Sequence, residues 1–290
     1  MAAVADVEAG AQAPAPIARP AGRRRSYPVW RWVILLLAGA YFVIPLYAAL
    51  RFAGLKAFPD IFKQAGFADA IELSLRLAVI TTILTLVLMV PTTIYVHLRL
   101  PQIRRTMEGI TILPIVIPPI VLIIGVLKVA PGFLLSTPYL LALVYVILAM
   151  PFAYRSLDAG LRAVDLKTLT EASNSLGAGW PTTLWRVVLP NIRTAMLSAT
   201  VLTVALVLGE FTMASLALYV TFPVWIVQFE QNSGPVSVAA SLLALFVTWL
   251  LLMVIVTVGG QGARKRGGAQ VSLFTVTPPR ETSHTTGEPE

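Results

Sequence analysis

Six long stretches with almost no charge limit what this sequence can fold into. Each is close to the roughly 20 residues that a helix needs to cross a lipid bilayer. Backbone N–H and C=O groups in hydrocarbon have no water to bind, so they must be satisfied within helices or a closed barrel. We therefore predict an all-α, polytopic membrane protein with six transmembrane helices, at approximately 29–52, 74–96, 110–129, 138–154, 194–218 and 236–258.

The amino-acid composition supports this class and excludes others. Of the 290 residues, 57% are apolar and 12% are charged, whereas about 25% charged residues is usual in soluble domains. A net charge of +8 could indicate nucleic-acid binding in a soluble protein, but basic loops beside a lipid bilayer account for it here, so we expect no nucleic-acid partner. The chain has no cysteine and only two histidines, His97 and His284, so we expect no disulfide, no metal site and no cofactor.

Lysine and arginine concentrate in alternate loops, which predicts that both termini lie in the cytoplasm. We expect a disordered cytoplasmic tail at 1–28, a first transmembrane helix and outer loop at 29–69, a transmembrane domain at 70–260 and a second tail at 261–290. A cleaved signal peptide is the alternative for the first stretch, but no clear small-residue cleavage site follows it. The basic residues that carry the orientation include Arg23, Arg24, Arg25, Arg99, Arg104, Arg105, Arg264, Lys265 and Arg266.

Prolines recur within the apolar stretches and cluster in the third. Neighbouring helices and hydroxyl groups can satisfy the carbonyl groups that a proline frees, so a single proline is tolerated in a membrane helix. The cluster of Pro114, Pro118 and Pro119 predicts that the third span is bent or broken.

A polar window at 154–194 separates the fourth and fifth stretches. Asp165 is a suitable N-cap for a short helix, and Gly177 and Gly179 can end that helix. Trp180 and Pro181 can open a second helix, because proline is well suited to a first turn. Two short cytoplasmic helices that dock on a soluble partner fit this pattern, and so does a connector whose helices pack on the membrane bundle.

The window resembles the signature loop of binding-protein-dependent ABC importer permeases of the MetI-like type. That signature reads E-A-A, then Gly six residues after the Glu, then I-x-L-P. Here Glu171, Ala172, Gly177, Leu189 and Pro190 are in register, while Ser173 replaces the second Ala and Val187 replaces the Ile. The resemblance covers roughly residues 70–260.

The resemblance implies a half-pore in the bacterial inner membrane without catalysis of its own. The loop would form a coupling helix that inserts into an ATP-binding subunit, through Glu171, Ala172, Ser173, Gly177, Leu189 and Pro190. The implied partners are two copies of that subunit, a second permease chain expected to be a different one, and an extracytoplasmic substrate-binding protein. ATP hydrolysis is expected on the partner, because this chain lacks a G-x-x-x-x-G-K-[ST] phosphate loop.

Two ionisable residues near the membrane interior are candidates for the translocation path, because such charges cost at least about 2.5 kcal/mol in a bilayer. These are Arg76 and Glu210. A structural role is one interpretation, with Arg76 paired either to Glu210 or to Glu72. The other is that Glu210 lines the path and favours a cation.

The substrate is the least constrained feature. Residues 113–124 and Gly209-Glu210-Phe211 resemble permeases for polyamines, iron(III), sulfate and aminoethylphosphonate. A polyamine is our leading expectation, because Glu210 would suit a cation. Residues 219–234 are expected to form an outer loop and short helix, either as a gate or as an interfacial aromatic belt.

Two other functional classes fit less well. A membrane-embedded enzyme would need a polar catalytic set within the spans, and the six stretches contain no suitable His, Cys or Asp pair. A secondary transporter is usually larger or internally repeated, and it would leave the polar window unexplained.

Overall fold

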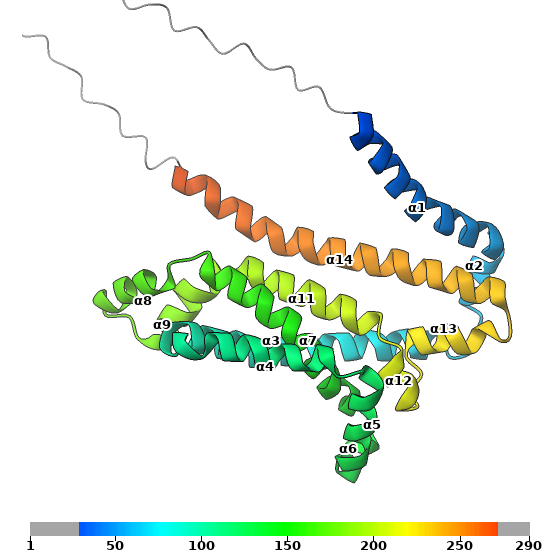
Figure 1. Cartoon of the computed structure of the whole chain (residues 1–290), viewed down its shortest axis with the longest axis horizontal. Coiled ribbons are helices and arrows are strands. Elements are labelled where there is room, and N and C mark those ends of the chain that lie inside the picture. The colour runs from blue at the N-terminus through cyan, green and yellow to red at the C-terminus, as the bar shows by residue number, and fades with distance from the viewer. Residues whose placement is uncertain (1–28, 272–290) are drawn as a thin grey trace, which may run out of the picture. The chain divides into compact units, whose positions relative to one another are not determined.

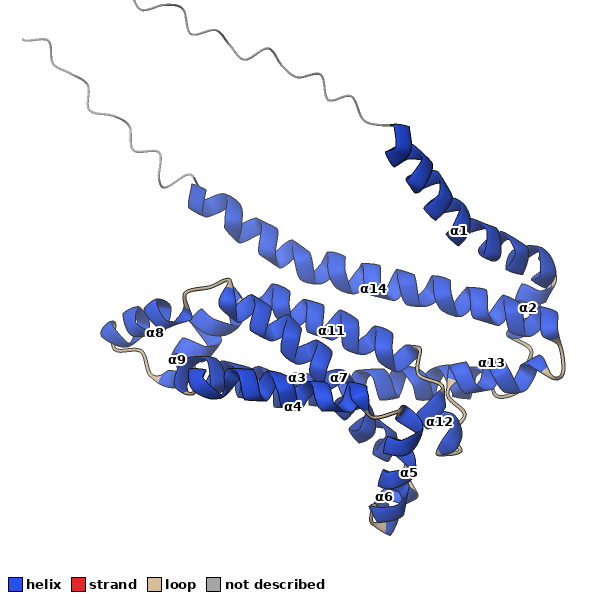
Figure 2. Ribbon diagram, viewed as in Figure 1, coloured by secondary structure: helices blue, strands red, loops and turns tan. Residues whose placement is uncertain are grey.

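The computed structural model describes residues 29–271, and every regular element in that range is a helix (Figure 2). The predicted tail at 1–28 lies outside the described residues. The chain divides into two compact units between Pro45 and Leu46, so the packing described below is that of the second unit. The purely helical secondary structure of residues 29–271 agrees with the predicted all-α class.

Four helices in the described range are long and apolar enough to cross a bilayer, and there are six candidate spans if each of two bent helix pairs counts as one. The four are α1 (Val29–Ala53), α3 (Phe67–Arg99), α7 (Tyr139–Arg162) and α14 (Gly234–Val271). The bent pairs are Pro101–Val116 with Pro119–Val129, at 93°, and Trp180–Asn191 with Arg193–Leu208, at 69°. Shorter elements are α2 (Ala57–Ile61), η1 (Pro101–Ile103), α6 (Gly132–Leu135) and α13 (Phe222–Glu230).

The third predicted span is broken where its prolines cluster, as expected. Helix α4 (Arg104–Val116) ends before Ile117, whose extended backbone is the conformation that a following proline favours. Pro118 is also extended, and Pro119 opens α5 (Pro119–Val129), where its missing N–H costs nothing. Pro114 lies inside α4 without ending it.

The fifth predicted span, 194–218, is wrong as one continuous helix. Helix α11 (Arg193–Leu208) stops at Gly209, and a separate short helix, α12 (Thr212–Leu216), follows. Apolar character alone could not reveal this break, because the residues on both sides of it are hydrophobic. The predicted tail at 261–290 also begins too early, since α14 continues to Val271.

Helices α3, α7 and α11 pack on one another, α4 packs on α7, and α14 packs on α11 and α13 (Figure 1). Side chains from α3, α7 and α11 form one buried core that also includes Leu166, Val188 and Ile192 from the segment between α7 and α11. A second core joins α3, α5, α7 and α12, and a third joins α2, α3, α13 and α14.

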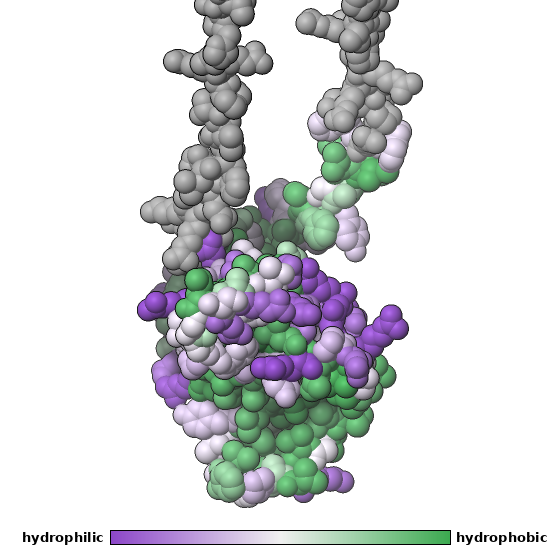
Figure 3. All heavy atoms as spheres, turned by 90° about the vertical axis from the view of Figure 1, so that its left-hand side faces the viewer, coloured by the Kyte–Doolittle hydropathy of each residue, from purple (hydrophilic) through white to green (hydrophobic). Residues whose placement is uncertain are grey.

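The two ends of these packed helices differ in character. Helices α8 (Leu166–Ser175) and α9 (Trp180–Thr183) lie at one end, and α13 lies at the other (Figure 1). Viewed from the end that carries α8 and α9, hydrophilic side chains gather in a band next to hydrophobic surface (Figure 3). The segment at 163–192, called the α7–α11 loop from here on, contains α8 and α9 and lies at that end.

Candidate functional site

Asp165 caps the first helix of the α7–α11 loop, as predicted. Its Oδ1 accepts a hydrogen bond from the Thr168 backbone N–H at 3.3 Å, and its Oδ2 accepts one from the Thr168 hydroxyl at 2.7 Å. These bonds favour the charged carboxylate, the side-chain bond most strongly, and lower the pKa of Asp165. Helix α8 therefore begins at a fixed residue.

Gly177 ends that helix, also as predicted. It has a φ of +77°, in the left-handed region that glycine enters without steric cost. Its N–H bonds to the carbonyl of Asn174, and the N–H of Ala178 bonds to the carbonyl of Ser173, at 2.9 and 3.1 Å. This is the Schellman arrangement, which satisfies the carbonyl groups left open at a helix end.

The second helix of the loop runs from Trp180 to Asn191 and contains one wide turn. Pro181 lies in its first turn, as predicted, and a π-helical segment, η2 (Leu184–Val188), leads into α10 (Leu189–Asn191). Pro190 has no N–H to bond to the turn before it, and the Leu189 N–H reaches back five residues to the Leu184 carbonyl. Leu189 and Pro190 lie in α10, and the chain bends after them, at Ile192.

The loop has a buried face and an exposed face. Leu166, Ser173, Thr183 and Val188 are buried, with Leu166 and Val188 in the core that α3, α7 and α11 share. Elsewhere the loop exposes Glu171, Ala172, Leu176, Trp180 and Trp185. Leu176 is 88% exposed and Trp185 is 70% exposed, which is unfavourable in water and typical of a surface that meets a partner. The buried residues fit a connector that packs on the membrane bundle, and docking of the exposed residues on a partner stays a prediction.

Ser173 and Thr183 join the two helices of the loop. Their hydroxyl oxygens are 2.8 Å apart, and either can be the donor. Ser173 is the residue that departs from the second Ala of the E-A-A pattern. The signature pattern gives no sign of its pairing with Thr183, which is ten residues away.

An ion cluster beside the loop was not predicted. The Asp158 carboxylate, which is buried, pairs with Arg162 one turn later on α7 and with Arg104 at the start of α4. Arg104 Nε is 3.0 Å from Asp158 Oδ1, and the contact is electrostatic rather than a well-aligned hydrogen bond. The i, i+4 spacing of Asp158 and Arg162 was the available sequence signal, whereas the pairing with Arg104 links α4 to α7 and is tertiary.

The two candidate path residues lie apart, and each has its own partner. Arg76 forms an ion pair with Glu72 one turn earlier on α3, both exposed, which is one of the two structural pairings considered above. Glu210 Oε2 accepts a hydrogen bond from the Tyr145 hydroxyl at 3.0 Å, and Oε1 accepts one from the Met213 N–H at 2.9 Å. Among the described residues Glu210 makes no ion pair with a cation, and its carboxylate caps α12.

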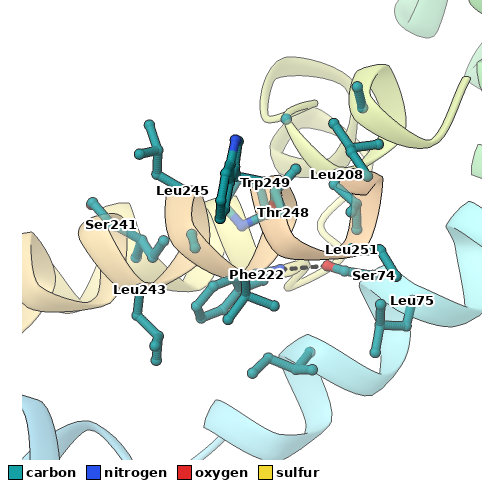
Figure 4. Close-up of a pocket in the computed structure, with 18 residues that line it drawn as sticks. Ser74, Leu75, Leu208, Phe222, Ser241, Leu243, Leu245, Thr248, Trp249 and Leu251 are labelled. Atoms are coloured by element: carbon teal, nitrogen blue, oxygen red, sulfur yellow. Dashed lines mark hydrogen bonds between the residues drawn. The ribbon is translucent and has the colours of Figure 1, made fainter. Parts of the chain in front are cut away.

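A cavity of about 520 Å³ opens between α3, α11, α13 and α14 (Figure 4). Its lining is almost entirely apolar and includes neither Arg76 nor Glu210. Within it, Ser74 Oγ accepts a hydrogen bond from the Phe222 N–H at 2.8 Å, which holds α13 against α3. The cavity therefore offers no counter-charge to an ionic substrate.

Helix α13 forms the short helix expected within 219–234. Trp225 is buried, stacks between Phe222 and Phe229, and donates from Nε1 to the Ala65 carbonyl at 3.0 Å. An interfacial aromatic belt would leave this ring at the surface, so at Trp225 the aromatic character belongs to the core. A gating role for α13 stays a prediction.

Comparison with known proteins identifies the family. Residues 89–261 match the family described as binding-protein-dependent transport system inner membrane component. The molybdenum transport system permease protein ModB of Mycobacterium tuberculosis is 29% identical over 255 residues, covering 81% of this chain and 94% of that protein. A probable molybdenum ABC transporter permease protein of Haloferax volcanii is 30% identical over 211 residues, covering 68% of this chain and 77% of its own.

A further relative matches this chain over a shorter stretch. The sulfate transport system permease protein CysW of Synechococcus elongatus is 43% identical over 72 residues, which is 24% of each chain. Members of this family are integral inner-membrane transport components that work with an ATP-binding subunit and a substrate-binding protein, and they are not themselves catalytic. The resemblance read from the α7–α11 loop is thus confirmed, and the chain belongs to the binding-protein-dependent ABC importer permease family.

Proposed function

We propose that this chain forms half of the translocation path of an ATP-driven importer and docks on the ATP-binding subunit through the exposed face of the α7–α11 loop. The observation that carries the proposal is the division of this loop into two faces. Leu166 and Val188 are buried in the shared core, while Leu176 and Trp185 are exposed hydrophobic side chains. Glu171 and Ala172 are exposed in the same loop.

Orientation and partners follow from this role. The loop and both termini would lie on the cytoplasmic side, where ATP is available, and hydrolysis would take place on two copies of the ATP-binding subunit. A second permease chain would complete the path. The apolar lining of the 520 Å³ cavity supports the need for a second chain. An ionic substrate would not cross an apolar cavity, so this chain's cavity does not by itself provide the path.

For the substrate, a tetrahedral oxyanion of the molybdate or sulfate type is the better-supported class. Two relatives are named for molybdenum and one for sulfate, and sulfate was already among the expected alternatives. The polyamine expectation depended on Glu210 as a free carboxylate. That carboxylate instead accepts hydrogen bonds from Tyr145 and from the first turn of α12, which removes the reason for expecting a cation.

The docking surface is tested with a matched pair of leucines. Leu176→Asp places a charge on the proposed docking face, and Leu55→Asp makes the same change at a leucine that is 82% exposed and precedes α2, at the other end of the packed helices (Figure 1). We expect Leu176→Asp to abolish co-purification of the ATP-binding subunit at unchanged permease abundance, and Leu55→Asp to retain it. Equal recovery of the ATP-binding subunit with both variants would contradict the proposed docking face.

The substrate class is tested by uptake into proteoliposomes that contain the full transporter. We expect labelled molybdate or sulfate to accumulate when ATP and the substrate-binding protein are present, with no competition from spermidine. Accumulation of spermidine in place of the oxyanions would restore the polyamine interpretation.

A further inference from the structure

The Ser173–Thr183 hydrogen bond connects two helices that are otherwise joined by a short turn. Ser173 is 8% exposed and Thr183 is fully buried, so neither hydroxyl can exchange its partner readily for water. Among the described residues, this is the one side-chain hydrogen bond between α8 and the helix Trp180–Asn191. Residues 176–179, which link the two helices along the chain, include Gly177 and Gly179 and are mostly exposed.

The second of these helices is joined to α11 at Ile192, where the helix is interrupted and the chain bends. At the 69° bend, the Ile192 N–H bonds to the Val188 carbonyl, and the Met196 N–H bonds to the Ile192 carbonyl. Val188, Ile192 and Ala195 belong to the same buried core. This shared core is the packed connection through which a displacement of the helix Trp180–Asn191 would reach α11.

Helix α8, by contrast, is held to the second helix by few polar contacts. Glu171 and Ala172 of this helix are exposed, and its only buried residues are Leu166 and Ser173. Without the hydroxyl pair, force applied to Glu171 or Ala172 could turn α8 about the glycine-containing link and leave the second helix in place.

We propose that Ser173 and Thr183 are positioning residues that make α8 and the helix Trp180–Asn191 move as one rigid lever. The inference depends on the proposed function, because the lever has a purpose only if an ATP-binding subunit acts on it. The hydroxyl pair is specific to a sequence in which Ser replaces the second Ala of the signature.

The first test removes one hydroxyl at a time. Ser173→Ala and Thr183→Val are compared with Ser175→Ala and Thr182→Val, which remove hydroxyls from exposed neighbouring positions. Ser175 Oγ bonds only within its own helix, to the Glu171 carbonyl. The transporter is reconstituted with its ATP-binding subunit, and both subunit retention and substrate transported per ATP hydrolysed are measured.

We expect Ser173→Ala and Thr183→Val to retain the ATP-binding subunit and to lower substrate transported per ATP, because loss of one net hydrogen bond shifts the equilibrium between joined and separated helices by about fivefold. The double variant should be no worse than either single variant, because both changes remove the same interaction. Unchanged transport per ATP in Ser173→Ala, or additive losses in the double variant, would overturn the inference. Loss of the ATP-binding subunit from the unaltered protein would instead refute the proposed function.

The second test replaces the hydrogen bond with a covalent one. Because the chain contains no cysteine, the double variant Ser173→Cys/Thr183→Cys has a single possible intramolecular disulfide. A rigid lever predicts that oxidation retains normal transport per ATP, and that the single Ser173→Cys variant does not respond to the oxidant. Loss of transport on oxidation, with the ATP-binding subunit still bound, would mean that the two helices must separate, and failure of the disulfide to form would contradict their proximity.

Discussion

Gly160 of α7 and Ala195 of α11 touch so closely that a Cβ atom on Gly160 would lie 2.2 Å from the Ala195 Cβ. Gly160 lies just before the end of α7, and Ala195 lies just after the start of α11. The contact therefore holds together the two points at which the chain leaves and rejoins the packed helices around the α7–α11 loop. Small residues permit such close approach between membrane helices, where van der Waals packing drives association.

Gly160→Ala should consequently destabilise the protein. The added methyl group would overlap Ala195 and force the helices apart, at a cost of about 1–3 kcal/mol. Gly109→Ala is the control, because nothing lies within 4 Å of a Cβ at that position of α4. Thermal unfolding in detergent should show a lower midpoint for Gly160→Ala and an unchanged or slightly raised one for Gly109→Ala, since alanine favours helix. Equal midpoints would mean that α7 and α11 separate without cost.

Asp158→Asn should destabilise the contact between α4 and α7. The substitution removes the charge that faces Arg104 and Arg162, while the arginines stay in place. Because both guanidinium groups are partly exposed, we expect a loss of about 1–2 kcal/mol, below that of a fully buried pair. Asp60→Asn, in the exposed pair with Lys63, should change stability by less than about 1 kcal/mol. A larger effect at Asp60 than at Asp158, measured by denaturation in detergent, would contradict this view of the cluster.

Glu210→Ala should reduce protein abundance rather than alter the substrate. The variant leaves the Met213 N–H and the Tyr145 hydroxyl without their acceptor, so α12 loses its cap. Tyr145→Phe removes only one of these bonds and should cost less, and the double variant should cost less than the sum of the two single effects. Uptake per unit of assembled transporter should stay near normal in Glu210→Gln. If Glu210→Gln instead assembled normally and lost uptake, Glu210 would line the path.

The start of α8 should be stable across the neutral pH range and weaken only in acid. Hydrogen bonds to Thr168 lower the pKa of Asp165 in the folded protein, so the charged cap adds stability above the ordinary pKa of Asp. That contribution is lost as the pH falls through the lowered pKa. Hydrogen exchange of the first turn of α8, corrected for the intrinsic rate, should therefore show constant protection between about pH 5 and 8 and a decline in stronger acid. Asp165→Asn keeps a capping side chain without the charge, and should show no such decline.

Sequence patterns predicted the features that depend on near neighbours along the chain. Asp165 caps α8 and Gly177 ends it, because a cap and a left-handed residue act within a few residues of their own position. The prolines at 118 and 119 break the third span for the same reason. The long apolar helices were predictable as well, since the requirement to satisfy backbone groups in hydrocarbon applies to each segment separately. By contrast, the sequence did not predict the break after Leu208, because the residues around it form an almost continuous apolar stretch. The Glu210 side chain within this stretch caps the helix that follows.

By itself, then, the sequence determined the class of protein, most of the span positions and the local form of the α7–α11 loop. Only the tertiary structure decided which distant polar groups meet: Glu210 with Tyr145 rather than Arg76, Arg104 with Asp158, and Ser173 with Thr183. The physical reason is that helical periodicity predicts which face of a helix is apolar. It does not predict which helix packs on that face, or the axial position at which the two helices meet. The partner helix and the axial position depend on where small residues such as Gly160 and Ala195 let two helices approach closely. They are determined only when the helices pack together.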